Sequence, residues 1–350
     1  MIDLRPLDLS YRTAYAQAKE LALAQGAVPL VTAGSIHVEP RKGGLYVYRY
    51  RYGATGKRDV EYLGPEGAEE TLLKVEQAQQ EIADNALIAG YARDLRRLGL
   101  YSVDNSTMAT IAALYNAGIF GRGGGRGALL VGTHAFGALL NELGVLGSPF
   151  PMTEDIDVAR AHRIEVAALP KGGLLDVLRQ TGLPFHEVPG LRRKEPATSY
   201  KARGTKLKVD LLVPSDERPF QAIAVPELKA YATGLPHLRY LLEGGSLSVL
   251  IGRERMVPVM VPHPGRFCLH KLAVYSLRSG GDNPKRDKDA HQAAMLCAAL
   301  TRESEWLLDE AAEALHRTLR ARVRPGAKRA AQLLGTRFPE AEERMTKLAE

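Results

Sequence analysis

Two acidic residues, Asp155 and Asp157, interrupt an otherwise apolar segment, and this pattern constrains the fold more than any other. The segment Asp155-Ile156-Asp157-Val158 alternates acidic and apolar side chains. Alternate residues of a strand point to the same face, so both carboxylates share one face. We therefore predict a strand that buries Ile156 and Val158 and can hold a divalent metal between its two carboxylates, an arrangement that suits phosphoryl transfer.

A third acidic residue, Asp210, lies in the apolar run of residues 207–213, which also reads as a strand. A carboxylate in such a strand is costly to bury unless it is paired, capped or bound to a cation. If this strand lies beside that of Asp155 and Asp157, three carboxylates converge. Oxygen ligands of this kind suit Mg2+ or Mn2+, and two such ions about 4 Å apart could activate an attacking oxygen and stabilise a leaving pyrophosphate.

A small-residue pair, Gly132-Thr133, ends the apolar strand 128–131 and precedes a short helix. The order of this pair, then Asp155-x-Asp157, then Asp210, resembles the polymerase-β-type nucleotidyltransferase superfamily. It is closest to bacterial nucleotidyltransferase-domain proteins related to the abortive-infection and minimal nucleotidyltransferases. The similarity covers roughly residues 120–300. It implies that Gly132 and Thr133 hold the triphosphate of a nucleotide, and that Asp155, Asp157 and Asp210 are catalytic and bind the metal ions.

The resemblance extends to two lysines. Lys271 lies in an amphipathic helix that follows a proline pair, and Lys288 lies beside Asp289 at the start of the next helix. In the related enzymes such lysines contact nucleotide phosphate, which implies nucleotide binding here; ordinary helix capping and surface charge are the alternative. One departure is His134, a bulky residue where many members have a small one. It is either a structural histidine at a strand end or a catalytic group.

These patterns together predict an α/β (α+β) nucleotidyltransferase core with a mixed sheet. We expect a small antiparallel β module with an N-terminal helix in residues 1–65 and a helical linker in 66–118. The catalytic domain follows in 119–262 and a helical domain in 263–350. The glycine-rich run 121–127 lacks the ending of a phosphate-binding P-loop, and a flexible connection is the favoured interpretation.

The first module contains a strand in which Tyr46, Tyr48, Tyr50 and Tyr52 share one face. The tyrosines can pack on the following helix while the arginines between them face water. Alternatively, they form a surface that stacks bases and contacts phosphates.

Composition and charge favour an anionic partner. The chain of 350 residues carries a formal net charge of +7, and residues 316–330 contain six Lys or Arg and no acid. That segment is either a phosphate-backbone surface or a solvated helix face.

Two cysteines without a Cys-x-x-Cys pair give no reason to expect zinc or a disulfide scaffold. The sequence has neither a signal peptide nor an apolar run long enough for a membrane, so we expect a cytoplasmic protein.

The sequence therefore predicts a metal-dependent enzyme that moves a nucleoside monophosphate from a nucleoside triphosphate to an acceptor and releases pyrophosphate. RNA such as tRNA, or a protein, is the expected acceptor, and a toxin-like role with an antitoxin partner is possible within this class. Two alternatives remain: a nucleic-acid-binding adaptor without activity, and an adenylyltransferase that modifies a small molecule such as an antibiotic.

Overall fold

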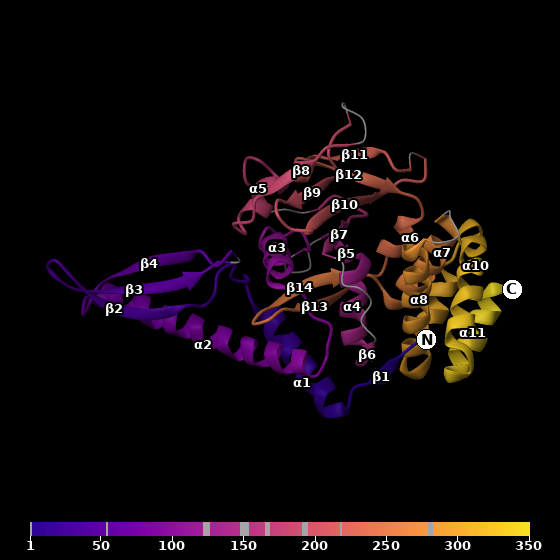
Figure 1. Cartoon of the computed structure of the whole chain (residues 1–350), viewed down its shortest axis with the longest axis horizontal. Helices are drawn as coiled ribbons and strands as arrows, with labels where there is room; N and C mark the ends of the chain where they lie inside the picture. The colour runs from indigo at the N-terminus through magenta and orange to yellow at the C-terminus, as the bar shows by residue number, and fades with distance from the viewer. Residues whose placement is uncertain are drawn as a thin grey trace.

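A mixed sheet at the centre of the chain carries the acidic residues (Figure 1). The computed structural model describes residues 2–53, 55–121, 127–147, 154–164, 169–190, 195–217, 219–278 and 283–350. Strand β10 pairs in parallel with β7 on one side and with β12 on the other. Strand β9 pairs with the first half of β10, and β5 pairs antiparallel with the outer edge of β7. The strands of this sheet are β5 (Leu129–Val131), β7 (Asp155–Ala159), β8 (Phe185–Val188), β9 (Ser199–Ala202), β10 (Lys208–Pro214), β11 (Ala222–Val225) and β12 (Ala230–Leu235).

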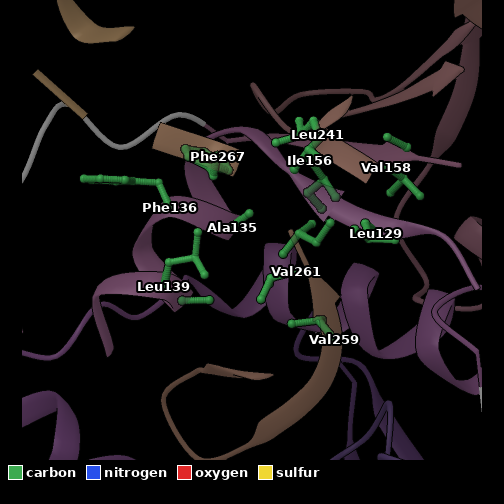
Figure 2. Close-up of a cluster of buried hydrophobic side chains, with 14 of the residues drawn as sticks. Leu129, Ala135, Phe136, Leu139, Ile156, Val158, Leu241, Val259, Val261 and Phe267 are labelled. Atoms are coloured by element: carbon green, nitrogen blue, oxygen red, sulfur yellow. The ribbon is translucent and has the colours of Figure 1, made fainter. Parts of the chain in front are cut away.

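The alternation of side chains in β7 and β10 fixes which face of the sheet is buried. Ile156 and Val158 are at most 2% exposed, and Val209 and Leu211 of β10 are at most 3% exposed. Figure 2 shows Ile156 and Val158 within a cluster of aliphatic and aromatic side chains. Helix α4 (Gly132–Glu142) and the hairpin β13 (Ser246–Ile251) and β14 (Met256–Val261) supply much of that cluster. The acidic residues at the intervening positions therefore point away from this core.

In the C-terminal part of the chain, helices α7, α8, α10 and α11 pack on one another (Figure 1). Helix α3 begins after Asp104, whose carboxylate accepts hydrogen bonds from the backbone N–H groups of Ser106 and Thr107. The remaining helices are α1 (Leu9–Ala24), α2 (Glu69–Arg97), α3 (Asn105–Asn116), α5 (Leu174–Arg179), α6 (Leu238–Leu242), α7 (Pro264–Leu277), α8 (Pro284–Glu303), α9 (Trp306–Glu313), α10 (Arg317–Leu334) and α11 (Pro339–Ala349).

Three antiparallel strands near the N-terminus, β2 (Ser35–Arg41), β3 (Gly44–Tyr52) and β4 (Arg58–Pro65), lie along helix α2. Together they project from the rest of the molecule (Figure 1). Two short strands, β1 (Leu4–Pro6) and β6 (Val145–Gly147), tie the N-terminus to the region that follows α4.

The interpretation in which the tyrosines of β3 pack on the helix is wrong. The face that meets α2 carries Val47 and Arg49, and Arg49 is 5% exposed. Its guanidinium donates to Glu81 of α2 over 2.7 Å and to the carbonyl of Ala33 over 2.9 Å. An arginine can bury its aliphatic stem when its charge is paired, so the tyrosines are left on the opposite, outer face.

Among the described residues, none of the helices is both long enough and apolar enough to cross a lipid bilayer. Most of the glycine-rich run and the basic residues 192–194 lie outside the described residues.

Two glycine substitutions test the packing of the C-terminal helices. A Cβ atom on Gly326 of α10 would lie 2.3 Å from the carbonyl oxygen of Leu272 of α7, whereas one on Gly90 of α2 meets nothing within 4 Å. We expect Gly326→Ala to lower the free energy of unfolding by about 1–3 kcal/mol through overpacking. Gly90→Ala should raise it by up to about 1 kcal/mol through helix propensity. Urea denaturation followed by circular dichroism measures both. Equal effects would contradict the close approach of α7 and α10.

Candidate active site

The three aspartates lie on two adjacent strands. Because β7 and β10 are parallel neighbours, Asp210 pairs directly with Asp157, and Lys208 pairs with Asp155. Asp155, Asp157 and Asp210 therefore point to the same face of the sheet, the one opposite the apolar core. The adjacency that the sequence analysis supposed is thus present.

Burial and neighbouring charge act together on Asp157. The pKa of this carboxyl is raised to about 7, first by its removal from water, and then by the Asp210 carboxylate; Lys271 acts in the opposite direction. A negative charge at Asp157 is therefore unfavourable in the folded protein. A divalent cation near these carboxylates would relieve this repulsion, and carboxylate oxygens are the ligands that Mg2+ and Mn2+ prefer. The donor chemistry of the three aspartates thus fits such an ion.

The half-buried carboxylate of Asp210 is paired with a cation and accepts a hydrogen bond. Lys208 Nζ lies 2.8 Å from Asp210 Oδ1, and the hydroxyl of Ser199 donates a hydrogen bond to the same oxygen. Within the described residues, no three His, Cys, Asp or Glu side chains are grouped closely enough to form a complete metal centre. In this structure Lys208 supplies the positive charge beside Asp210.

Glycine at position 132 is required by both conformation and space. Its φ is +70°, which L-residues with a Cβ rarely adopt. A Cβ atom would also lie 2.1 Å from Asp157 Oδ2. Gly132 begins α4, a helix of 11 residues with no side-chain cap at its N-terminus. Backbone N–H groups in the first turn of such a helix can bind an anion.

The two predicted lysines approach this turn from the C-terminal helices. Lys288 Nζ donates a hydrogen bond of 2.8 Å to Thr133 Oγ1. Lys271 Nζ lies 2.8 Å from Asp289 Oδ1, and Arg278 Nε lies 2.7 Å from Asp289 Oδ2. The buried Asp289 carboxylate thus ties α7 to α8 and holds Lys271 in place. The pKa of Lys288 is lowered, first by burial and then by the nearby Lys271 ammonium.

His134 follows Thr133 in the first turn of α4 and is 1% exposed. Its Nδ1 is 2.7 Å from the hydroxyl of Tyr101. Burial lowers the pKa of this imidazole to about 4, so it is neutral at physiological pH. These properties fit a structural histidine better than a group that exchanges protons near neutrality.

The structure therefore brings the seven predicted residues to one region and adds residues that the sequence analysis missed. Ser199 and Lys208 contact Asp210, and Arg278 contacts Asp289. Lys208 could have been found, because it stands two positions before Asp210 in the same strand and so shares its face. Ser199 and Arg278 reach the site only through strand and helix pairing, and no local pattern marks them.

Comparison with known proteins identifies the family of this chain. A family described as Nucleotidyltransferase matches residues 105–316, more than half of the chain. The match includes β5, α4, β7, β10, α7 and α8, which carry the seven site residues. The chain belongs to this nucleotidyltransferase family, whose name indicates a transferase that uses nucleotide substrates. No curated protein and no solved structure shows significant similarity.

Because a negative charge at Asp157 is unfavourable in the folded protein, replacing Asp157 with a neutral residue should stabilise the fold. The unfolded chain releases this proton near pH 3.8, whereas the folded protein keeps it until about pH 7. The wild type therefore loses stability relative to Asp157→Asn as the pH rises through that window, and the difference becomes constant above about pH 8. In metal-free buffer at pH 8 we expect the variant to be more stable by on the order of 1–3 kcal/mol. Urea denaturation at pH 5 and pH 8 measures the difference.

The matched control for this comparison is Glu187→Gln, which removes an exposed carboxylate of β8. We expect it to change the free energy of unfolding by less than about 0.5 kcal/mol. An Asp157→Asn variant less stable than the wild type at pH 8 would contradict the electrostatic account of the site.

Proposed function

We propose that this protein is a polymerase-β-type nucleotidyltransferase that transfers a nucleoside monophosphate from a nucleoside triphosphate to an acceptor and releases pyrophosphate. The proposal rests above all on one observation: Asp155 and Asp157 lie beside Asp210 on parallel strands, directly against the Gly132 turn. Family membership gives the general activity, and this arrangement supports the finer assignment.

The chain supplies separate groups for the phosphates and for the reacting oxygen. The N-terminus of α4, the Thr133 hydroxyl and the Lys288 ammonium would bind the β- and γ-phosphates. Lys271, held by Asp289, would add positive charge toward the same phosphates. Binding these groups orients the α-phosphate toward the carboxylates of β7 and β10.

The reaction is a substitution at the α-phosphorus. The acceptor oxygen forms a bond to this phosphorus while the bond to the bridging oxygen breaks, and pyrophosphate leaves with that electron pair. Asp155, Asp157 and Asp210 would hold Mg2+ or Mn2+, which when bound stabilises the charge on both oxygens. Asp210, already an acceptor for Ser199 and Lys208, would assist removal of the proton from the acceptor.

The choice of acceptor is the finer part of the proposal, and we favour RNA, with protein as the second possibility. The presence of all three aspartates argues against an inactive adaptor. A small-molecule adenylyltransferase would leave the β2–β4 module without a role.

Transfer of label from nucleotide to acceptor tests the proposed chemistry. We expect label from an α-labelled nucleoside triphosphate to appear in one fraction of RNA, protein or small molecules when Mg2+ or Mn2+ is present. The double variant Asp155→Asn/Asp157→Asn should lower this transfer at least about 100-fold, because charge stabilisation at the reacting centre is lost. Glu187→Gln should transfer normally. Transfer by the double variant at the wild-type rate would contradict the assignment of this site as catalytic.

A lysine pair in α8 tests phosphate binding independently of catalysis. Lys288 contacts Thr133, whereas Lys285 in the first turn of the same helix is exposed. We expect Lys288→Gln to weaken binding of a non-hydrolysable nucleoside triphosphate about 10-fold or more, since a charge-assisted phosphate contact is lost. Lys285→Gln should bind like the wild type. Isothermal titration calorimetry measures both, and an equal loss in the two variants would indicate a nonspecific charge effect.

A further inference from the structure

The outer face of the β2–β3–β4 sheet carries a cluster of rings that the proposed chemistry does not use. Its rings, which we call the tyrosine face, belong to His37, Tyr46, Tyr48, Tyr50 and Tyr62. The ring centroids of Tyr48 and Tyr62 are 5.4 Å apart, those of Tyr46 and Tyr62 are 6.2 Å apart, and those of His37 and Tyr50 are 5.3 Å apart. The rings thus form two groups on one face of the three strands, which meet where Tyr48 and Tyr50 follow each other on β3.

Much of this aromatic surface is open to solvent: His37 and Tyr62 are exposed, and Tyr46, Tyr48 and Tyr50 are half-buried. Helix α2 covers the opposite face of the sheet, where Val47, Leu63 and Ala78 form a small core. The sheet and α2 project from the rest of the molecule (Figure 1). Tyr62 is 53% exposed. Packing these rings on α2 would remove more apolar surface from water and stabilise the fold, so their exposure indicates a ligand.

The charge around the tyrosine face is positive. Four Lys or Arg, at positions 41, 42, 57 and 58, stand on this face or in its turns beside one acid, Glu39, which pairs with Arg41; Arg49 and Arg51 lie on the inner face. The guanidinium of Arg58 lies 4.8 Å from the centroid of Tyr50, and that of Arg41 lies 5.1 Å from the centroid of Tyr48. Lys42 and Lys57 stand in the two turns at opposite ends of β3, and neither is in an ion pair within the part of the chain that the structure describes. An anionic ligand with flat, apolar faces matches this combination.

We infer that the tyrosine face binds single-stranded nucleic acid. Unpaired bases expose the faces that stack on tyrosine rings, and the phosphates between them complement Arg41, Arg58 and the two lysines. A duplex hides its base faces within its own stack, so this surface suits a duplex poorly. The binding requires neither the triphosphate nor a metal ion, and it therefore stands independently of the transferase assignment.

One end of the sheet lies next to the catalytic part of the chain. The turn between β3 and β4 meets the segment before β8, because a Cβ atom built on Gly182 would lie 3.8 Å from Thr55 Cγ2. A strand that lies along β3 therefore runs toward the catalytic domain. If the acceptor is RNA, this surface holds it.

Binding of short labelled oligonucleotides to the full-length protein tests the inference. Fluorescence anisotropy in EDTA, without nucleotide, would use a 12-nucleotide oligo-uridine RNA, the matching oligo-thymidine DNA, and a 12-base-pair RNA duplex. We expect micromolar or tighter binding of the single strands and at least 10-fold weaker binding of the duplex. Tyr48→Ala/Tyr62→Ala should weaken single-strand binding at least about 30-fold, since two stacking platforms are lost. Tyr48→Phe/Tyr62→Phe should stay within about 3-fold of the wild type.

Two controls separate the face from other causes of lost binding. Tyr11→Ala/Tyr231→Ala removes two exposed tyrosines elsewhere, which are 38% and 42% exposed, and should bind normally. Asp157→Asn should also bind normally, so an inactive transferase does not affect this result. Thermal denaturation confirms that each variant is folded, and sedimentation confirms that its oligomeric state is unchanged.

Four results would overturn the inference. The first is that the wild type fails to bind either single strand at 100 µM protein. The second is that the alanine double variant binds as tightly as the wild type, and the third is that the duplex binds as tightly as the single strands. A shift of the alanine variant to a smaller oligomer would also overturn it, because a second copy of the chain would then be the occupant.

Discussion

The parallel pairing of β7 with β10 is the constraint on which the rest of the site depends. It places the carboxylates of Asp157 and Asp210 opposite each other on one face of the sheet. Two like charges in a partly buried position destabilise the fold unless cations or protons offset them. The raised pKa of Asp157 expresses this cost. A divalent cation bound between these carboxylates would reduce the repulsion that destabilises the fold.

The positively charged side chains around the aspartates offset the repulsion between their carboxylates. Lys208 neutralises Asp210 from within the same strand, whereas Lys271 and Lys288 come from helices far along the chain. Asp289 holds Lys271 against α8, and the hydrogen bond from Lys288 to Thr133 joins α8 to the start of α4. The C-terminal helices are therefore part of the site, because they carry the positive charge that faces the carboxylates. The same charge lies next to the Gly132 turn, where phosphate would bind.

In the β2–β4 sheet the usual pattern of burial is reversed: a charged residue is buried and aromatic residues are exposed. The ion pair between Arg49 and Glu81 fixes the inner face, and the tyrosines face water as a consequence. An alternating strand presents two faces, and the alternation by itself does not say which one meets the neighbouring helix. The partners on this side, Glu81 of α2 and the small core of Val47, Leu63 and Ala78, favour the arginine face.

The sequence by itself determined the acidic strands, the glycine turn and the order of these motifs, because each depends on side-chain alternation or local backbone conformation. The family resemblance then supplied Lys271 and Lys288. The tertiary structure alone decided that Ser199 contacts Asp210, that Arg278 contacts Asp289, and that the tyrosines face outward. These features depend on strand register and helix contacts between segments distant in the chain, and local patterns carry no information about such pairings.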